Sequence, residues 1–291
     1  MGSALLVTLR ESLEAALVIG LMLGYLVRVG KSKLIRAVWW GTGAAVAGSI
    51  LTAYLFERLA GGFEGRGEQI FEGLMMLAAV ILLTTMILWM QRQSRGLRRR
   101  IEERLARTVA TGESLGIGSL AFLAVFREGV ETTVFIQTAL FSATGQEVLL
   151  GAVIGLVVAT VLALLTYRGA VRLDLRSFFL WTGALLILFA AGLLAHGVHE
   201  LEEAGFLPPL VEHLWDINGR LNEKGAVGSF LKALFGYNGD PSLTEAVSWL
   251  IYLLTTARLY FGRLRLGQPE GDELVASYDT ERRRKRDAVS S

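Results

Sequence analysis

Cysteine is absent from this chain of 291 residues, and only four residues are proline. The absence of cysteine excludes disulfides, thiolate metal sites, haem attachment through cysteine and iron–sulfur clusters. Any metal site in this chain must therefore be built from carboxylates, histidines or backbone oxygens.

Charged residues are also scarce. They make up 19% of the chain, against 53% for hydrophobic residues, whereas soluble domains usually carry about 25% charged residues. The formal net charge is only +2, so the distribution of the charges is more informative than their sum. This composition favours a membrane protein.

A membrane-spanning helix needs about 20 mostly apolar residues, and seven stretches of the chain have about this length. We therefore expect an all-α polytopic membrane protein with seven transmembrane helices. The first stretch is too long for a signal peptide and lacks a basic leader, so we interpret it as a retained helix. The stretches are 4–27, 37–55, 71–90, 115–142, 148–167, 178–198 and 243–261.

Basic residues gather on one side of this seven-span arrangement. The loops at 28–36, 92–107 and 168–176, together with the chain from 258 onward, hold 22 of the 29 lysines and arginines. Because basic loops are retained in the cytoplasm, we expect an external N-terminus and a cytoplasmic C-terminus. We interpret 266–291 as a disordered basic tail that meets anionic lipid rather than nucleic acid.

Two of the expected spans carry the same charged pattern, RESLE at 10–14 and REGVE at 127–131. One charge at the bilayer centre costs about 2.5–3.5 kcal/mol, so six unpaired charges would cost roughly 15–20 kcal/mol. That exceeds the stability of most proteins, which is about 5–15 kcal/mol. These side chains must therefore face one another, water or an ion.

The spacing of the motif indicates a metal site. Residues three apart share a helix face, so two such helices facing each other present four carboxylates, which suit iron or another hard cation. A structural Arg–Glu network without a ligand is the alternative. We predict metal ligands at Glu11, Glu14, Glu128 and Glu131, with Arg10 and Arg127 as charge partners.

The two motifs also indicate an internal repeat. They lie in the first and fourth expected spans, which cross the membrane in opposite directions. This is typical of an inverted repeat, with the substrate at the repeat interface near the midplane. We expect one transmembrane domain over 1–265, made of repeats at about 1–91 and 114–200 and a seventh helix. Glycine pairs at 20/24 and 151/155 predict close helix contacts, within or between chains.

A second acidic group is expected on the outer side. Acids precede the third span and follow the sixth, where they would collect cations in an external vestibule; acids solvated at helix ends are the alternative. The external segment 201–240 has apolar residues at helical spacing, which predicts one or two short interfacial helices. The vestibule residues are Glu64, Glu68, Glu72, His199, Glu200 and Glu203.

The paired motifs resemble the high-affinity iron permease family, whose hallmark is R-E-G-L-E in spans 1 and 4. Glu72-Gly73, Trp89-Met90 and His199-Glu200 are similar to its bacterial branch. The resemblance implies iron import, an extracytoplasmic oxidase or iron-binding protein as partner, and a location in the bacterial cytoplasmic membrane. It implies no tightly bound cofactor, because iron is the transported substrate.

Two other functions remain compatible with the residues. One is transport of another cation, such as manganese, lead or protons. The other is a membrane metalloenzyme that uses the carboxylates with His196 and His199, although no nucleophile motif supports it, so we expect a transporter and not an enzyme. The sequence does not determine whether the iron is ferrous or ferric, how transport is coupled to energy, or the oligomeric state.

Overall fold

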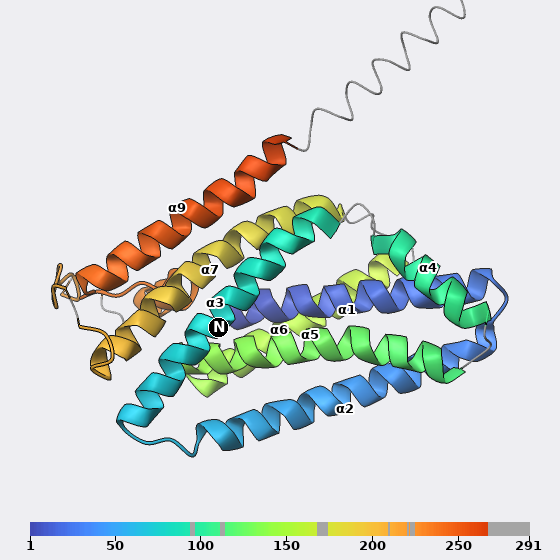
Figure 1. Cartoon of the computed structure of the whole chain (residues 1–291), viewed down its shortest axis with the longest axis horizontal. Helices are drawn as coiled ribbons and strands as arrows, with labels where there is room; N and C mark the ends of the chain where they lie inside the picture. Colours follow the sequence, from blue (N-terminus) through green and yellow to red (C-terminus); the bar gives the residue numbers. More distant parts are fainter. Residues whose placement is uncertain are drawn as a thin grey trace, which may run out of the picture.

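The computed structural model describes residues 1–93, 97–110, 114–167, 174–208, 210–219, 221 and 225–266. The expected basic tail from 267 onward and residues 168–173 of the basic loop lie outside this range. Within the described ranges the regular structure is entirely helical (Figure 1), which confirms the all-α class.

Each of the seven predicted apolar stretches falls in one long helix. Four regions are long and apolar enough to cross a membrane: Ser32–Leu59, Arg66–Met90, Gly145–Tyr167 and Ser177–Glu203. These findings support a multi-pass membrane protein. The long helices are α1 (Gly2–Arg28), α2 (Ile35–Ala60), α3 (Arg66–Gln93), α5 (Ser114–Ser142), α6 (Gly145–Tyr167), α7 (Leu175–Glu203) and α9 (Leu243–Leu266).

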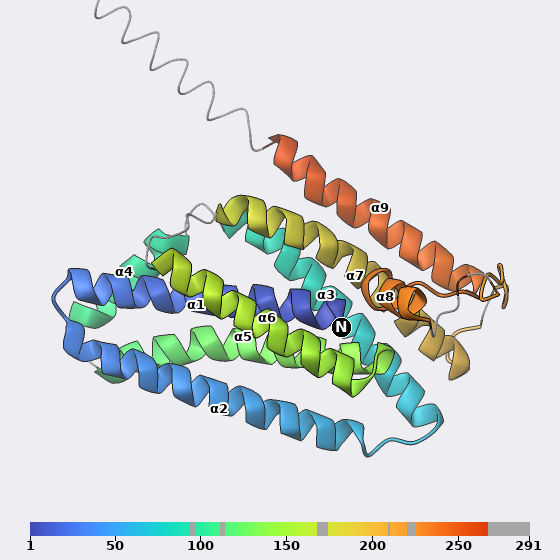
Figure 2. The same cartoon turned by 180° about the vertical axis from the view of Figure 1, so that it is seen from behind.

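The long helices pack in two groups. In the first, α1 lies along α6, α2 lies along α5, and α1 also contacts α5. In the second, α3 lies along α7, and α9 covers α7 at the edge of the bundle. In both views α3, α7 and α9 run obliquely to α1 and α5 (Figures 1 and 2). The core of the second group contains Met76, Leu83, Leu186 and Phe189.

Glycines determine how closely the helices approach. A Cβ atom at Gly155 of α6 would lie 2.6 Å from the carbonyl oxygen of Leu5 on α1, and a Cβ at Gly151 would overlap the backbone of Met1. The prediction that this glycine pair allows close helix contact is confirmed within the chain. Gly20 and Gly24, in contrast, would have no atom within 4 Å of an added Cβ.

Helix α4 (Leu97–Ala110) occupies a segment that the sequence analysis treated only as a basic loop. Ile101, Leu105 and Val109 recur every four residues, so they share one helix face. That face packs into a core with residues of α1 and α5, and Leu105 is only 1% exposed. In Figure 1, α4 lies across the ends of these two helices.

One of the expected helices of the outer segment forms. Helix α8 (Ala226–Phe235) ends at Gly236, whose φ of +69° is left-handed. The expectation of one or two short helices in this segment is met by this one alone, since 210–219 forms turns and bends. Its backbone pairs with another segment instead, since Leu214 N–H donates to Pro241 (3.0 Å) and Ile217 N–H donates to Gly239 (2.9 Å). These bonds replace those of a helix.

Candidate metal centre between helices α1 and α5

Carboxylates from both charged motifs meet where α1 and α5 contact each other. Oxygen atoms of Glu11, Glu128 and Glu131 all lie within 4.8 Å of one another. Glu11 is 1% exposed and Glu128 is also buried. The i, i+3 spacing places Glu128 and Glu131 on one face of α5, and the contact with α1 brings Glu11 to that face. We call these three residues the carboxylate triad.

The remaining carboxylate of the predicted set, Glu14, pairs with its own arginine. Arg10 Nε donates to Glu14 Oε1 at 3.1 Å. The second motif repeats this geometry, because Arg127 Nε donates to Glu131 Oε1 at 2.8 Å. Each arginine therefore binds the last glutamate of its own motif, one helical turn later. Glu131 belongs to both this ion pair and the triad.

Both arginines also contact the end of α3. Arg10 Nη2 lies 2.8 Å from Met90 Sδ, and the guanidinium carbon of Arg127 lies 5.1 Å from the centre of the Trp89 ring. In the sequence this Trp-Met pair is only part of a family resemblance, and nothing there predicts its contact with the two arginines. No local pattern in the sequence could reveal which helix end lies beside the motifs.

Several buried polar atoms of the centre have no hydrogen-bond partner in the described part of the chain. They are both carboxylate oxygens of Glu11, Oε2 of Glu128, Nη1 of Arg10 and Oγ1 of Thr8. Buried polar groups are normally satisfied, and a buried charge without a partner is costly. Oxygens oriented in this way fit a cation ligand set, because a bound ion would satisfy them.

Small residues allow the neighbouring helices to close around the motif. A Cβ atom at Gly129, within the second motif, would overlap Ser49 Oγ on α2. That hydroxyl donates to the carbonyl oxygen of Ala45 at 2.9 Å. The glycine of the motif therefore lets α2 pack directly behind the acidic face of α5.

The predicted vestibule residues lie at the N-terminal end of α3 and the C-terminal end of α7. Glu72 and Glu200 are half-buried and interact electrostatically. The two helices are in close contact at this point, since a Cβ atom at Gly73 of α3 would lie only 2.9 Å from the carbonyl oxygen of Gly197 on α7. Glu68 and Glu64 are exposed, the latter in the turn before α3.

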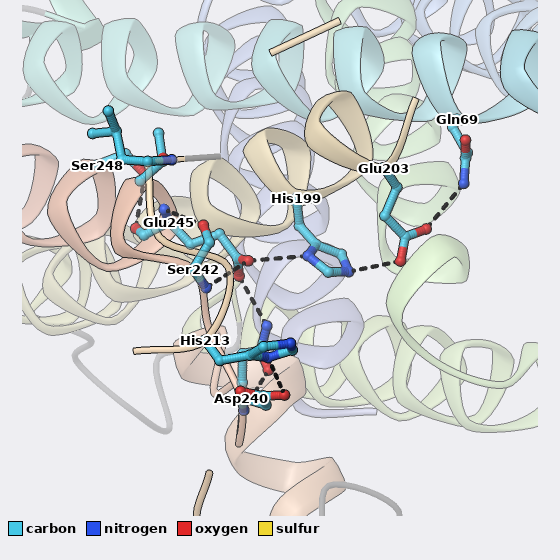
Figure 3. Close-up of polar contacts among 11 residues, drawn as sticks. Gln69, His199, Glu203, His213, Asp240, Ser242, Glu245 and Ser248 are labelled. Atoms are coloured by element: carbon cyan, nitrogen blue, oxygen red, sulfur yellow. Dashed lines mark hydrogen bonds and ion pairs between the residues drawn. The ribbon is translucent and has the colours of Figure 1, made fainter. Parts of the chain in front are cut away.

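A network around His199 links three helices at this end of the bundle (Figure 3). The Nδ1 atom of His199 lies 3.0 Å from Glu245 Oε1, and its Nε2 lies 3.3 Å from Glu203 Oε1. Glu203 in turn accepts a hydrogen bond from Gln69 on α3, at 2.9 Å. The histidine thus connects α7 with α9, and Glu203 connects α7 with α3.

Sequence reasoning missed Glu245, although a local signal was present. Ser242 and Glu245 form a capping box at the start of α9, where each backbone N–H donates to the other side chain at 3.1 Å. The pattern S-x-x-E before an apolar run is the signature of this cap. Glu245 also accepts from Asn238 Nδ2 at 2.9 Å, which fixes the carboxylate that faces His199.

The fold and the centre together define a class, namely helical membrane proteins with a buried carboxylate site between two charged helices. Residues 1–267 match the model of the iron permease FTR1 family. The chain belongs to this family.

Curated relatives agree with the family match. The chain is 34% identical over 251 residues to the ferrous iron permease EfeU of Escherichia coli O6:H1, covering 86% of this chain and 91% of the relative. It is 31% identical over 258 residues to the EfeU of Yersinia pestis, covering 88% and 92% respectively. No solved structure matches the chain significantly. Because the family and these relatives are permeases, the chain is a transporter and not an enzyme.

Proposed function

We propose that this protein imports ferrous iron through a site formed by Glu11, Glu14, Glu128 and Glu131. The observation that carries the proposal is the carboxylate triad, whose oxygens lie within 4.8 Å of one another between α1 and α5. Glu14 completes the set when it leaves Arg10. The names of the relatives in Escherichia coli and Yersinia pestis support ferrous iron as the ion.

The charge of the centre suits a divalent ion. Four ionised glutamates and the two arginines of the motifs leave two negative charges. A divalent cation neutralises them, which matters because charge is costly inside a membrane. Carboxylate oxygens also accept manganese, so manganese is the second candidate. Ferrous iron is favoured because it is the ion in the names of the relatives.

The packing of the helices supports an inverted repeat with seven spans. In such a repeat α1 corresponds to α5, α2 to α6 and α3 to α7. The contact of α1 with α6 then corresponds to the contact of α5 with α2, and both are present. The contacts α1–α5 and α3–α7 each join two corresponding helices. The candidate site then lies on the axis of the repeat, where transporters commonly bind substrate. The proposal includes one domain over 1–265 with an external N-terminus in the bacterial cytoplasmic membrane.

The outer acids would form the entrance. Glu64, Glu68, Glu72, Glu200 and Glu203 gather around the ends of α3 and α7, with His199 between them. A cluster of negative charge raises the local concentration of cations and speeds their encounter with the site. An extracytoplasmic oxidase or iron-binding protein would deliver iron to this surface.

The test is anaerobic uptake of ferrous iron into proteoliposomes. Glu11→Gln and Glu128→Gln remove one charge each from the triad at constant shape, so uptake should fall to background while the protein stays inserted. Glu57→Gln changes an exposed carboxylate on α2 and serves as the control. Uptake by both triad variants at the wild-type rate would disprove the site. Uptake of manganese at the same efficiency as iron would favour the second candidate.

A further inference from the structure

The two charged motifs belong to one group of helices, but their arginines are anchored to the other. α1 and α5 carry the motifs, whereas Trp89 and Met90 are consecutive residues near the end of α3, which packs with α7. Consecutive helix residues point in directions about 100° apart. One short segment of α3 can therefore contact an arginine from each motif.

The anchoring is the same in kind for both motifs. In each, Nε of the arginine binds the last glutamate of the motif, at 3.1 Å for Arg10 and 2.8 Å for Arg127. The remainder of each guanidinium contacts α3, through the sulfur of Met90 in one case and the ring face of Trp89 in the other. Arg127 Nε also lies 3.9 Å from Glu128 Oε1, so Arg127 has two carboxylate partners where Arg10 has one. Each arginine has one uncharged partner on α3.

Iron binding creates a problem that the uncharged partners can solve. When Glu14 and Glu131 turn to the ion, each arginine loses its closest carboxylate. Arg10 is only 1% exposed, and a buried charge that loses its partner is strongly destabilising. The loaded state therefore needs another group that holds the guanidinium.

We infer that Trp89 and Met90 are positioning residues, which hold Arg127 and Arg10 while Glu131 and Glu14 coordinate the transported ion. This inference rests on the proposed function. The aromatic face attracts a guanidinium through its quadrupole, and the thioether is a weak, polarisable acceptor. Neither group carries a negative charge, so neither neutralises the arginine permanently or competes with the glutamates for the ion.

The loss of these anchors should weaken iron binding rather than slow transport at saturation. In the empty state each arginine still has its glutamate, so the lost contact costs little. In the loaded state the sulfur of Met90 is the remaining side-chain partner of Arg10 among the described residues, so its loss costs more. Met90→Leu should therefore raise the half-saturating ferrous iron concentration about fivefold, which corresponds to about 1 kcal/mol. Trp89→Leu should raise it less, because the Arg127 side chain is 46% exposed. Both variants should keep a maximal rate within twofold of wild type.

The experiment measures ferrous iron uptake by the full chain in proteoliposomes, with thermal stability in detergent. Trp89→Phe keeps an aromatic face and Met90→Gln keeps an uncharged acceptor, so both should restore the half-saturating concentration. The controls are Trp181→Leu, which changes an exposed tryptophan on α7, and Met75→Leu, which changes a half-buried methionine on α3. These controls should match the wild type.

The outcomes separate this inference from the proposed function. Leucine variants that match their controls, or a Trp89→Phe variant as impaired as Trp89→Leu, would overturn the anchoring role. A fall in maximal rate at unchanged half-saturation would also overturn it. If Glu11→Gln and Glu128→Gln both transport iron normally, the proposed function itself fails. If a leucine variant does not fold, the test compares Trp89→Phe and Met90→Gln with the wild type. An unchanged half-saturating iron concentration in these variants supports the inference, and a fivefold rise overturns it.

Discussion

Arg10 and Glu14 form an ion pair within one helical turn of α1, with Nε 3.1 Å from Oε1. Because both residues belong to the same helix, one turn apart, the helix alone brings them within reach of each other. Arg127 and Glu131 form the same pair on α5, at 2.8 Å. The two pairs differ in their surroundings, since the Arg10 side chain is 1% exposed and the Arg127 side chain is 46% exposed.

This difference predicts unequal effects of removing the arginines. Arg10→Ala leaves buried carboxylates without a counter-charge, which costs about 3–5 kcal/mol for a buried pair. Arg127→Ala should cost less, because solvent or headgroup contact screens an exposed pair. Thermal unfolding in detergent measures both, with the exposed Arg58→Ala as control. Equal losses for Arg10 and Arg127 would contradict the assigned burial.

Neutralising the last glutamate of either motif should abolish uptake. Glu14→Gln and Glu131→Gln retain size and hydrogen bonding but remove a charge that a dehydrated cation requires. We expect iron uptake below about a tenth of the wild-type rate. This corresponds to an increase of more than about 1.4 kcal/mol in the activation free energy of transport. The variants should still insert and fold, which size-exclusion chromatography checks. Uptake near the wild-type rate from both would leave these residues as structural ion pairs.

The outer acids should affect apparent affinity more than maximal rate. Glu72→Gln should raise the half-saturating iron concentration more than Glu68→Gln, because Glu72 is half-buried beside Glu200 whereas Glu68 is exposed, and exposed charges are screened by salt. Uptake measured at low and high ionic strength tests both variants. A collapse of the rate at saturating iron, with unchanged affinity, would disprove the collecting role.

Because α6 packs closely on α1, the stability of the protein should depend on the size of the side chain at particular positions of α6. Gly155→Leu would force a side chain against the backbone of Leu5 and Leu9, where even a Cβ would lie 2.6 and 2.9 Å from backbone atoms. We expect a large loss of folded protein, judged by detergent extraction and thermal stability. Gly24→Leu is the matched control, because an added Cβ there meets no atom within 4 Å. Similar losses at both positions would contradict packing against α1 as the cause, because leucine has a higher helix propensity than glycine.

The proposed orientation is tested by reporter fusions. A reporter after Ser291 or within 97–107 should report a cytoplasmic location, and one within 219–225 should report an external location. The reason is the retention of lysine and arginine on the cytoplasmic side. A cytoplasmic signal from the 219–225 fusion would require a different number of spans.

Helical periodicity and hydropathy are local properties, so the sequence alone determined the seven long helices and the faces of the charged motifs. The seven apolar stretches each became one helix, and the spacing of Glu128 and Glu131 placed both on one face. The arginine patterns also identified the family, because a repeated charged motif in two apolar spans is specific. Even the cap at Ser242 and Glu245 had a readable signal.

Tertiary structure alone decided which groups meet across helices. Apolar surfaces look alike in sequence, so hydropathy does not reveal which helices are neighbours or how far one is displaced along another. That displacement brings Trp89 and Met90 to the arginines. The clustering of Glu11 with the α5 glutamates while Glu14 stays on Arg10 has the same origin, because side-chain partners follow from the crossing of α1 and α5.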